Sequence, residues 1–260
     1  MLGCSAMHPS AKKSLGQHFL QDRSAVMRIV AAVPAGARIL EIGPGPGALT
    51  EPLLERAGAL AVIERDDRFA ARWQARADED ARLSVLHGDV LELLDAAVRG
   101  FGPTWIVGNL PYNISGPLTA ALASFRLDGG MVLMYQREVA ERLLAGPGGK
   151  TYGGLSVLVR HHYTPSRLLT LPPGAFSPPP KVHSTVIMLM PHGREPACDY
   201  TALQRAVRTG FAHRRKTVAN NFRGVLDETA WERLGIDPGC RPERLDYDAW
   251  VRIATALERC

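Results

Sequence analysis

The sequence predicts an α/β protein with an open, doubly wound and mostly parallel sheet, followed by a small all-helical C-terminal domain. Three observations support this fold class. Short apolar runs alternate with longer amphipathic runs between residues 38 and 190, a glycine-rich turn follows the first apolar run, and the pattern is helical throughout from about residue 200. Alternating strands and helices build parallel sheets, whose ligands bind at the carboxyl ends of the strands.

The apolar runs are predicted to be strands because they are short and dominated by apolar residues, which is typical of strands buried on both faces. The expected strands cover residues 38–42, 59–64, 83–86, 104–108 and 131–134, with a further strand over residues 184–190. Amphipathic runs over residues 49–56, 68–77, 117–124 and 138–144 are the expected helices.

The second domain is predicted from a change of pattern after the last expected strand. Residues 191–196 read Pro-His-Gly-Arg-Glu-Pro, a composition typical of a linker. We therefore place the domain boundary near residue 192, with an α/β domain over residues 1–191 and a helical domain over residues 192–260.

The composition is that of an ordinary globular protein, with 46% hydrophobic and 22% charged residues. No apolar run reaches the roughly 18 residues of a membrane span, and the first residues lack the apolar core of a secretory signal. A cytoplasmic protein without a membrane partner is therefore expected. The formal net charge of +5 favours a polyanionic partner. No CxxC pair occurs, so neither a metal site nor a disulfide framework is expected from Cys4, Cys198, Cys240 and Cys260.

Residues 41–47, Glu-Ile-Gly-Pro-Gly-Pro-Gly, form the glycine-rich turn after the first expected strand. Glycine lets a ligand approach the backbone, so Gly43 and Gly45 are candidate cofactor contacts; a tight strand-to-helix connection is the alternative. Glu64 ends the second expected strand, where an acid can bind a ribose diol, and Asp89 follows the third, where it can accept from an adenine amine. Each acid alone is compatible with a solvated loop position, but three successive strand ends together indicate a nucleoside cofactor.

The spacing of this turn and its first residue favour S-adenosylmethionine over NAD. The glycines follow a GxGxG spacing, whereas the dinucleotide-binding fingerprint is GxGxxG. Glu41 would repel a diphosphate but attract the cationic amino-acid moiety of S-adenosylmethionine. The region resembles motif I of class I methyltransferases, which implies a Rossmann-like sheet that binds this cofactor.

Residues 109–112, Asn-Leu-Pro-Tyr, follow the fourth expected strand and are the candidate catalytic motif. An exocyclic adenine amine is a poor nucleophile because its lone pair is delocalised into the ring. The side-chain carbonyl of Asn109 and the backbone carbonyl of Leu110 are candidate acceptors for the amine's hydrogens, and Pro111 fixes the turn. Tyr112 offers a flat face on which the base can stack. Alignment and electrostatics then supply the catalysis, without a metal; an ordinary turn is the alternative.

The longer segment 109–115, Asn-Leu-Pro-Tyr-Asn-Ile-Ser, resembles the catalytic motif of the small-subunit (16S) ribosomal RNA adenine N6,N6-dimethyltransferases, the family tied to kasugamycin sensitivity. The resemblance covers nearly the whole chain, including segments 13–20, 214–221 and 241–245. It implies that Phe176 packs against the target base opposite Tyr112. Judged without the family, a phenylalanine such as Phe176 is more often a core residue, and a histidine such as His18 is more often structural than a ligand. The cofactor contacts that the resemblance implies are His18, Leu20, Gly43, Glu64, Asp89 and Asn109.

By this resemblance the enzyme uses S-adenosylmethionine to dimethylate the N6 amines of two adjacent adenosines near the 3′ end of small-subunit ribosomal RNA, coupled to maturation of the subunit. Its partner would be that RNA or the pre-ribosomal small subunit, and a monomeric chain is expected. Residues 1–191 would then be the catalytic domain that binds the cofactor, and residues 192–260 the RNA-binding domain.

Basic residues without any acidic residue fill the stretch between residues 205 and 223. On a continuous helix, at about 100° per residue, five of them share one sector beside an apolar sector that suits packing on the core. Such a face can follow RNA phosphates while the first domain supplies the chemistry; a solvated basic surface is the alternative. The candidate RNA-binding residues are Arg205, Arg208, Arg215, Lys216 and Arg223, and the apolar sector comprises Val207, Phe211, Val218, Phe222 and Val225.

Other functions stay open at this point. A large-subunit adenine methylase of the erythromycin-resistance type would share fold, cofactor and chemistry, although Leu110 and the C-terminal match favour the small-subunit family. A ribosome-assembly binding factor with dispensable catalysis is a second alternative. A DNA adenine methylase and an NAD-dependent oxidoreductase are disfavoured, the first by the whole-chain resemblance and the second by the glycine spacing and Glu41.

Overall fold

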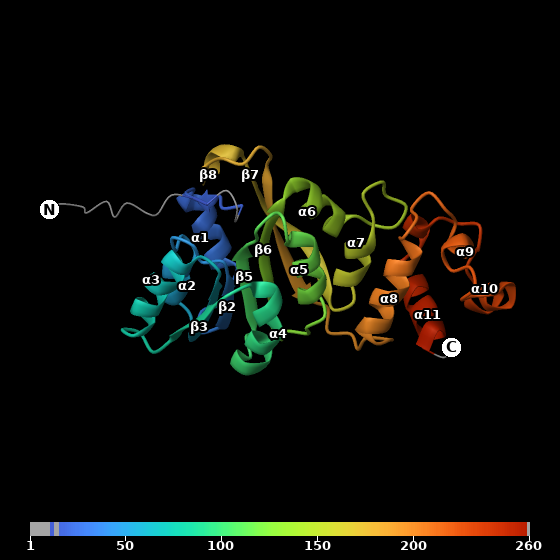
Figure 1. Ribbon diagram of the computed structural model, residues 1–260, viewed down its shortest axis with the longest axis horizontal. Helices are drawn as coiled ribbons and strands as arrows, with labels where there is room; N and C mark the ends of the chain where they lie inside the picture. The colour runs from blue at the N-terminus through green and yellow to red at the C-terminus, as the bar shows by residue number, and fades with distance from the viewer. Residues whose placement is uncertain (1–10, 13–15, 259–260) are drawn as a thin grey trace. The chain divides into compact units, whose positions relative to one another are not determined.

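A computed structural model describes residues 11–12 and 16–258 of the chain (Figure 1). Its main element is a seven-stranded sheet with the strand order β4-β3-β2-β5-β6-β9-β7, and β1 and β8 form a separate two-stranded sheet. The five strands from β4 to β6 are parallel, as the doubly wound class requires. The strands are β1 (Phe19–Leu20), β2 (Arg38–Ile42), β3 (Ala59–Glu64), β4 (Leu83–His87), β5 (Trp105–Asn109), β6 (Gly130–Gln136), β7 (Tyr163–Leu171), β8 (Phe176–Ser177) and β9 (Ser184–Pro191).

The order of the parallel strands reverses at β2. From β2 the chain proceeds outward through β3 and β4 on one side, and through β5 and β6 on the other. Ile42, the last residue of β2, is in register with Gly108 of β5. The turn after β2 and the segment after β5 are therefore neighbours at the carboxyl edge, where doubly wound sheets bind their ligands.

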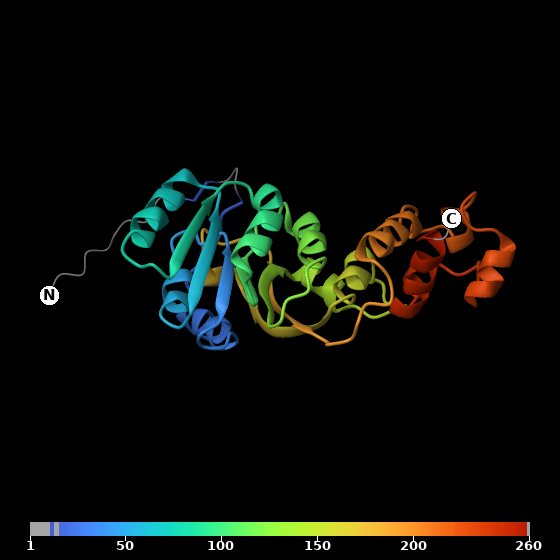
Figure 2. The same cartoon turned by 90° about the horizontal axis from the view of Figure 1, so that it is seen from below.

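Helices connect the strands and flank the parallel part of the sheet on both faces (Figure 2). Aspartates begin several of the helices, and in the parallel part of the sheet the side chains of Asp22, Asp66 and Asp89 accept backbone N–H groups in the first turns of α1, α3 and α4. The helices are α1 (Arg23–Ala31), α2 (Thr50–Leu54), α3 (Asp67–Ala77), α4 (Val90–Phe101), α5 (Ser115–Leu122), α6 (Arg137–Leu144), α7 (Gly154–Val159), α8 (Tyr200–Gly210), α9 (Val218–Asn221), α10 (Glu228–Leu234) and α11 (Tyr247–Glu258).

The chain divides into two compact units. Unit 1 comprises Met1–Leu118, Leu127–Arg137 and Arg167–Met188; unit 2 comprises Thr119–Arg126, Glu138–Ser166 and Leu189–Cys260. In unit 1, apolar residues of β2, β3 and β5 pack with those of α1, α2 and α3 around the buried rings of Phe69 and Trp73. This core fixes the strand ends that carry the candidate site.

Unit 2 is built around a second apolar core, which holds Phe222, Trp231 and Trp250. Segments from before and after the last strand share this core. Val157 and Leu158 of α7 belong to the same apolar cluster as Leu203 of α8, and this shared burial joins residues 138–166 to the C-terminal helices. The compact units thus differ from the linear division that the sequence suggests at residue 192.

The continuous helix expected through residues 205–225 is wrong. Helix α8 ends at Gly210, residues 211–216 form turns and a bend, and α9 covers only Val218–Asn221. The side-chain Nδ2 of Asn221 donates to the backbone carbonyl of Gly210 at 2.7 Å and to that of His213 at 3.3 Å. These bonds satisfy backbone carbonyls at the end of α8. Val225, placed in the apolar sector by the continuous helix, is 49% exposed.

The helices of the described part of the chain include none with the length and apolar character of a membrane span.

Candidate active site

A cavity in unit 1 lies at the carboxyl edge of the parallel strands. Its empty volume is about 1080 Å³, including the part open to solvent. Nearly all of the site residues predicted in this unit line it, together with Glu41 and the segment Gly16–Leu20 before α1. The predicted residues in the lining are His18, Leu20, Gly43, Gly45, Glu64, Asp89, Asn109, Leu110, Pro111 and Tyr112. Phe176 is the predicted residue of unit 1 that does not line the cavity.

The glycine-rich turn after β2 forms one wall. Gly43, Gly45 and Gly47 have φ angles of +69°, +50° and +99°, in the region that favours glycine. A Cβ on Gly43 would have no atom within 4 Å, so the backbone there is open to a ligand. A Cβ on Gly47 would lie 2.6 Å from the ring of Trp73, whose Nε1 donates to the carbonyl of Gly45 at 2.9 Å. Helix α3 thus holds the turn through Trp73.

Glu64, at the end of β3, ties the second strand end to the same turn. Its Oε2 accepts from the amide of Gly45 at 2.9 Å, and its Oε1 accepts from the amide of Asp66 at 2.7 Å. Burial raises the pKa of Glu64, and these backbone hydrogen bonds act in the opposite direction. Since a carboxylate oxygen has two lone pairs, Glu64 can also accept from a ribose diol.

Glu41 is a buried carboxyl group in the cavity lining, only 2% exposed. Burial raises its pKa to about 8, while the nearby polar side chain of Thr50 lowers it and the charges of Glu64 and Glu51 raise it further. Its Oε2 has no hydrogen-bond partner among the described residues. A buried acceptor without a partner fits a cationic ligand group, so the residues present suit the ammonium end of S-adenosylmethionine.

Asp89 follows β4 and serves two local roles. Its Oδ1 accepts from the amide of Leu91 at 2.9 Å, which begins α4, and its Oδ2 forms an ion pair with Arg65 at 3.0 Å. The side chain remains a quarter exposed and lines the cavity. Asp89 is therefore held in place by α4 while part of it stays accessible to a ligand.

The amide of Asn109 has a defined orientation at the end of β5. Its Nδ2 donates to the carbonyl of His18 at 2.8 Å. Because a carbonyl only accepts, the amino group must face His18, and Oδ1 is left as the acceptor of a side chain that lines the cavity. Leu110 follows with its side chain 1% exposed and its amide donating to Met134 at 3.3 Å. The backbone immediately after Asn109 is thereby hydrogen-bonded to β6.

Tyr112 is held through both its hydroxyl and its ring. The hydroxyl is 2.6 Å from Oγ of Ser184, and the ring stacks on His18 with centroids 5.6 Å apart and planes inclined by 28°. Burial raises the pKa of Tyr112, with the hydrogen bond to Ser184 acting in the opposite direction. The side chain is therefore a neutral phenol at physiological pH and presents a flat, partly exposed ring.

The segment Gly16–Leu20 completes the cavity, and the sequence pattern gave no sign of how it is held. The buried carboxylate of Asp66 accepts from Nζ of Lys12 at 3.1 Å and from Nε2 of Gln17 at 3.0 Å. The hydrogen bond from Arg68, above all, keeps the pKa of Asp66 well below its usual range. Beyond Gln17, β1 pairs with β8. Residues 13–15 of the predicted N-terminal motif lie outside the described residues.

Phe176 lies in β8, opposite Leu20 of β1, and is 3% exposed. Its side chain belongs to the apolar core of unit 1. The structure therefore places it as a core residue, the alternative that the sequence left open, and its packing against a target base stays a prediction.

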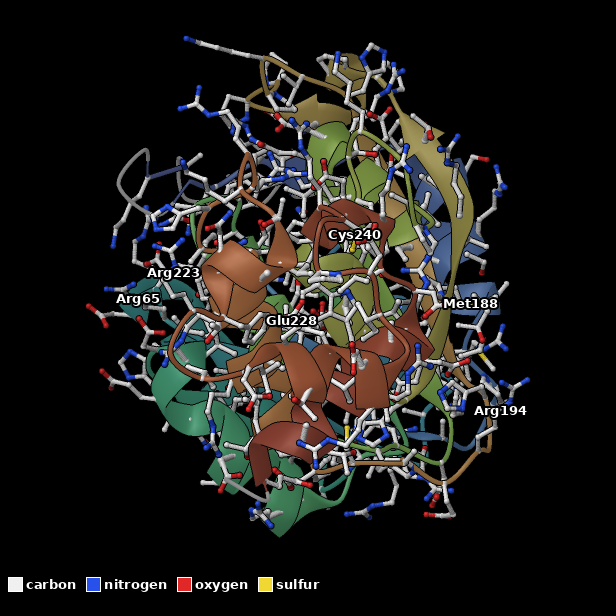
Figure 3. All side chains as sticks on the ribbon, turned by 90° about the vertical axis from the view of Figure 1, so that its right-hand side faces the viewer. Arg65, Met188, Arg194, Arg223, Glu228 and Cys240 are labelled. Atoms are coloured by element: carbon white, nitrogen blue, oxygen red, sulfur yellow. The ribbon has the colours of Figure 1, made fainter. Side chains whose placement is uncertain are left out.

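The predicted RNA-binding residues are all exposed, but they come from three different pieces of unit 2. Two lie on α8, two lie in the turns at 211–216, and Arg223 follows α9; Figure 3 labels it and also Glu228 at the start of α10. Arg214, which the helical sector left out, donates to the carbonyl of Tyr152 at 2.7 Å and to that of Lys150 at 3.3 Å. The residues are Arg205, Arg208, Arg215, Lys216 and Arg223.

Within residues 11–12 and 16–258, no group of three or more His, Cys, Asp or Glu side chains is arranged to hold a metal ion. Cys198 and Cys240 are free thiols, and Cys4 and Cys260 lie outside the described residues.

The family model for ribosomal RNA adenine dimethylase matches residues 8–259 of the chain. The chain belongs to the ribosomal RNA adenine dimethylase family. It is 44% identical over 257 residues to a ribosomal RNA small subunit methyltransferase A of Xanthomonas oryzae pv. oryzae, covering 96% of this chain and 97% of the relative. It is likewise 44% identical to the protein of that name from Pseudomonas putida, covering 95% of each chain.

Solved structures confirm the class I methyltransferase fold. A dimethyladenosine transferase from Plasmodium falciparum superposes with a TM-score of 0.79 at 25% identity, covering 93% of this chain and 98% of that one. The 23S rRNA methyltransferase ErmE superposes with a TM-score of 0.64 at 21% identity, over 92% and 99% of the two chains, which shows a shared fold. This member of the dimethylase family is thus a ribosomal RNA adenine dimethyltransferase that uses S-adenosylmethionine.

Proposed function

We propose that the protein dimethylates the N6 amines of two adjacent adenosines near the 3′ end of small-subunit ribosomal RNA, as a step in the maturation of that subunit. The observation that carries this proposal is the orientation of Asn109, whose Nδ2 is committed to the carbonyl of His18. The remaining Oδ1 is an acceptor, which is the group needed to orient an adenine amine. Small-subunit methyltransferases at 44% identity over nearly the full length support the choice of substrate.

The cavity would hold S-adenosylmethionine through the predicted contacts His18, Leu20, Gly43, Gly45, Glu64, Asp89 and Asn109. Glu41 would pair with the ammonium group, Glu64 would accept from the ribose hydroxyls, and Asp89 would accept from the adenine amine. The bound cofactor supplies a methyl group already activated on a positively charged sulfur. What remains for the protein is to align and polarise the nucleophile.

The amine would be aligned by the segment that follows β5. Oδ1 of Asn109 and the backbone carbonyl of Leu110 accept the two amine hydrogens, which draws the nitrogen out of conjugation with the ring and aims its lone pair. Pro111 fixes the turn between these groups. The ring of Tyr112 binds the base by stacking, an interaction worth about 1–3 kcal/mol in single-stranded nucleic-acid sites. Phe176 stays the candidate for packing on the other side of the base.

The helical region would position the RNA. Residues 192–260 are the proposed RNA-binding domain, and residues 1–191 the catalytic one. The exposed cations at positions 205, 208, 215, 216 and 223 would neutralise phosphates, which fixes register without reading sequence. The target adenosine must be unpaired or flipped out to reach the cavity. We expect a cytoplasmic, monomeric enzyme.

The proposal is tested by incubating the protein with isotopically labelled S-adenosylmethionine and separated ribosomal subunits, and then mapping the methylated adenines. Dimethylation of two neighbouring adenosines near the 3′ end of the small-subunit RNA is expected. Label confined to large-subunit RNA would instead identify an erythromycin-resistance type of methylase. Tight small-subunit binding without any methylation would identify an assembly factor.

A further inference from the structure

Tyr112 is fixed by residues far from its own motif. Its hydroxyl meets Oγ of Ser184 at 2.6 Å, and one face of its ring is covered by His18, with centroids 5.6 Å apart. Ser184 is the first residue of β9 and is fully buried. The phenol therefore contacts a hydroxyl whose position is set by the sheet.

The start of β9 is itself anchored. The amide of Arg137, which follows β6, donates to the carbonyl of His183 at 2.9 Å. A buried hydroxyl requires a hydrogen-bond partner, and the phenol of Tyr112 is the partner of Ser184. Without this hydrogen bond, the ring of Tyr112 could rotate about its two side-chain torsions. Because Ser184 is held by the sheet, the hydrogen bond fixes the orientation of the ring.

His18 contacts both ends of the catalytic motif. Its ring stacks on Tyr112, and its backbone carbonyl accepts from Nδ2 of Asn109. The ring is held in turn by Nδ1, which lies 2.8 Å from the carbonyl of Pro178. Because that carbonyl only accepts, Nδ1 carries the proton and donates. One residue therefore sets the plane of the ring and the orientation of the amide together.

We propose that Ser184 and His18 are positioning residues that bracket Tyr112, so that the target adenine stacks on the ring face opposite His18 with its amine directed at Oδ1 of Asn109. The inference rests on the proposed function, which assigns the base to this ring. Neither residue of the bracket needs to touch the base, because each acts through Tyr112. Stacking energy is gained only when base and ring are parallel, so a fixed tilt favours the reactive orientation.

The bracket is tested with Ser184→Ala and Tyr112→Phe, which remove the two oxygens of one hydrogen bond. Each single variant is expected to lower kcat by about three- to tenfold. The double variant should be no slower than the slower single variant, because both changes remove the same contact. Ser184→Thr, which retains a hydroxyl, should restore most of the rate. Effects of the two single changes that multiply in the double variant would overturn the bracket.

A second readout follows the base directly. An RNA fragment with 2-aminopurine at the target position should be quenched on binding the wild-type protein and less quenched by Ser184→Ala, with the affinity for S-adenosylmethionine unchanged. Equal quenching by both proteins would overturn the proposal. Thr185→Ala is the matched control, because Thr185 is also a buried hydroxyl of β9 but pairs with Thr170 at 3.4 Å. It should leave the quenching unchanged.

These outcomes are separable from failure of the proposed function. If the wild-type protein does not methylate small-subunit RNA, the function itself is wrong. If the wild type methylates normally and Ser184→Ala does the same, only the bracket is wrong. If Ser184→Ala fails to fold, Tyr112→Phe tests the bracket instead, because it removes only one oxygen from a ring that lines the cavity. A kcat of Tyr112→Phe equal to that of wild type would overturn the bracket.

Discussion

The cavity of unit 1 and the basic surface of unit 2 bring their residues together in opposite ways. The cavity collects residues from distant parts of the chain, from Gly16 to Ile114, because parallel strands end at one edge of the sheet. The basic residues are close in sequence, yet they are distributed over α8, a turn and the segment after α9. Sheet topology thus determines a site even when sequence separation is large, whereas helical periodicity determines a face only while the helix continues.

The largest expected effect concerns the acceptor at the end of β5. Asn109→Ala removes both Oδ1 and the donor to His18. Loss of one preorganised group of this kind costs about 10²–10³ in kcat. RNA affinity should stay within about twofold of wild type, because the basic surface is untouched. Single-turnover methylation and filter binding measure the two quantities; a kcat equal to that of wild type would remove Asn109 from the chemistry.

The second effect tests how tightly the glycine turn is built. In Gly47→Ala, the new methyl would meet the ring of Trp73 at 2.6 Å on a backbone with a φ of +99°. Overpacking and left-handed strain together are expected to destabilise the protein by about 2–4 kcal/mol. Gly100→Ala is the control, because its Cβ has no neighbour within 4 Å and the position lies in α4. Denaturant unfolding should show loss for the first variant and no loss for the second.

The third effect concerns the turn that interrupts the basic stretch. Neutralising Arg215 and Lys216 together with glutamine should lower the slope of log affinity against log salt by about 1.4–1.8, because two phosphate contacts are lost. Arg99→Gln serves as a control, since Arg99 lies in unit 1 and pairs with Asp95 at 2.9 Å. A salt slope that does not change in the double variant would place the RNA elsewhere.

The smallest effect is a pH dependence from Glu41, whose pKa is raised from 4.5 to about 8. The group is mostly neutral at pH 7 and ionises as the pH passes 8, whereas an α-amino group loses its proton at about 7.7–8.0, so affinity for the cofactor's ammonium group should pass through a shallow maximum near pH 8. Because the folded pKa is the higher one, stability of the ligand-free protein should fall as the pH rises from 4.5 through 8. Calorimetry of Glu41→Gln should show this maximum removed, and a maximum that persists in the variant would exclude Glu41 as its cause.

The parallel strands were predictable from the local alternation of apolar and amphipathic runs. Most of the cavity was predictable from the rule that ligands bind at the carboxyl ends of parallel strands. The strand that ends at Asn109 and the acids Glu64 and Asp89 were all placed by that rule, and they do line one cavity. Helices α1 and α4 were not predicted, although Asp22 and Asp89 are N-caps that signal where they begin.

Other features were beyond a local pattern. Strand β7 contains Pro165 and several partly exposed residues, so its sequence does not look like a buried strand. Proline is tolerated in β7 because this strand lies at the edge of the sheet. The contact between Tyr112 and Ser184 joins residues 72 positions apart, and the sequence around neither residue predicts it. The end of α8 depends on Asn221 binding back to Gly210, a tertiary contact that overrides helical periodicity.

The pairing of β1 with β8 gives the protein an order of assembly. Phe19 and Leu20 stand in the cavity wall, yet their partners are Ser177 and Phe176. During synthesis from the N-terminus, the parallel strands up to Asn109 leave the ribosome long before those partners exist. The parallel strands β2 to β5 can therefore pair early in a nascent chain, but the cavity wall that contains β1 is completed only after Ser177 has been synthesised.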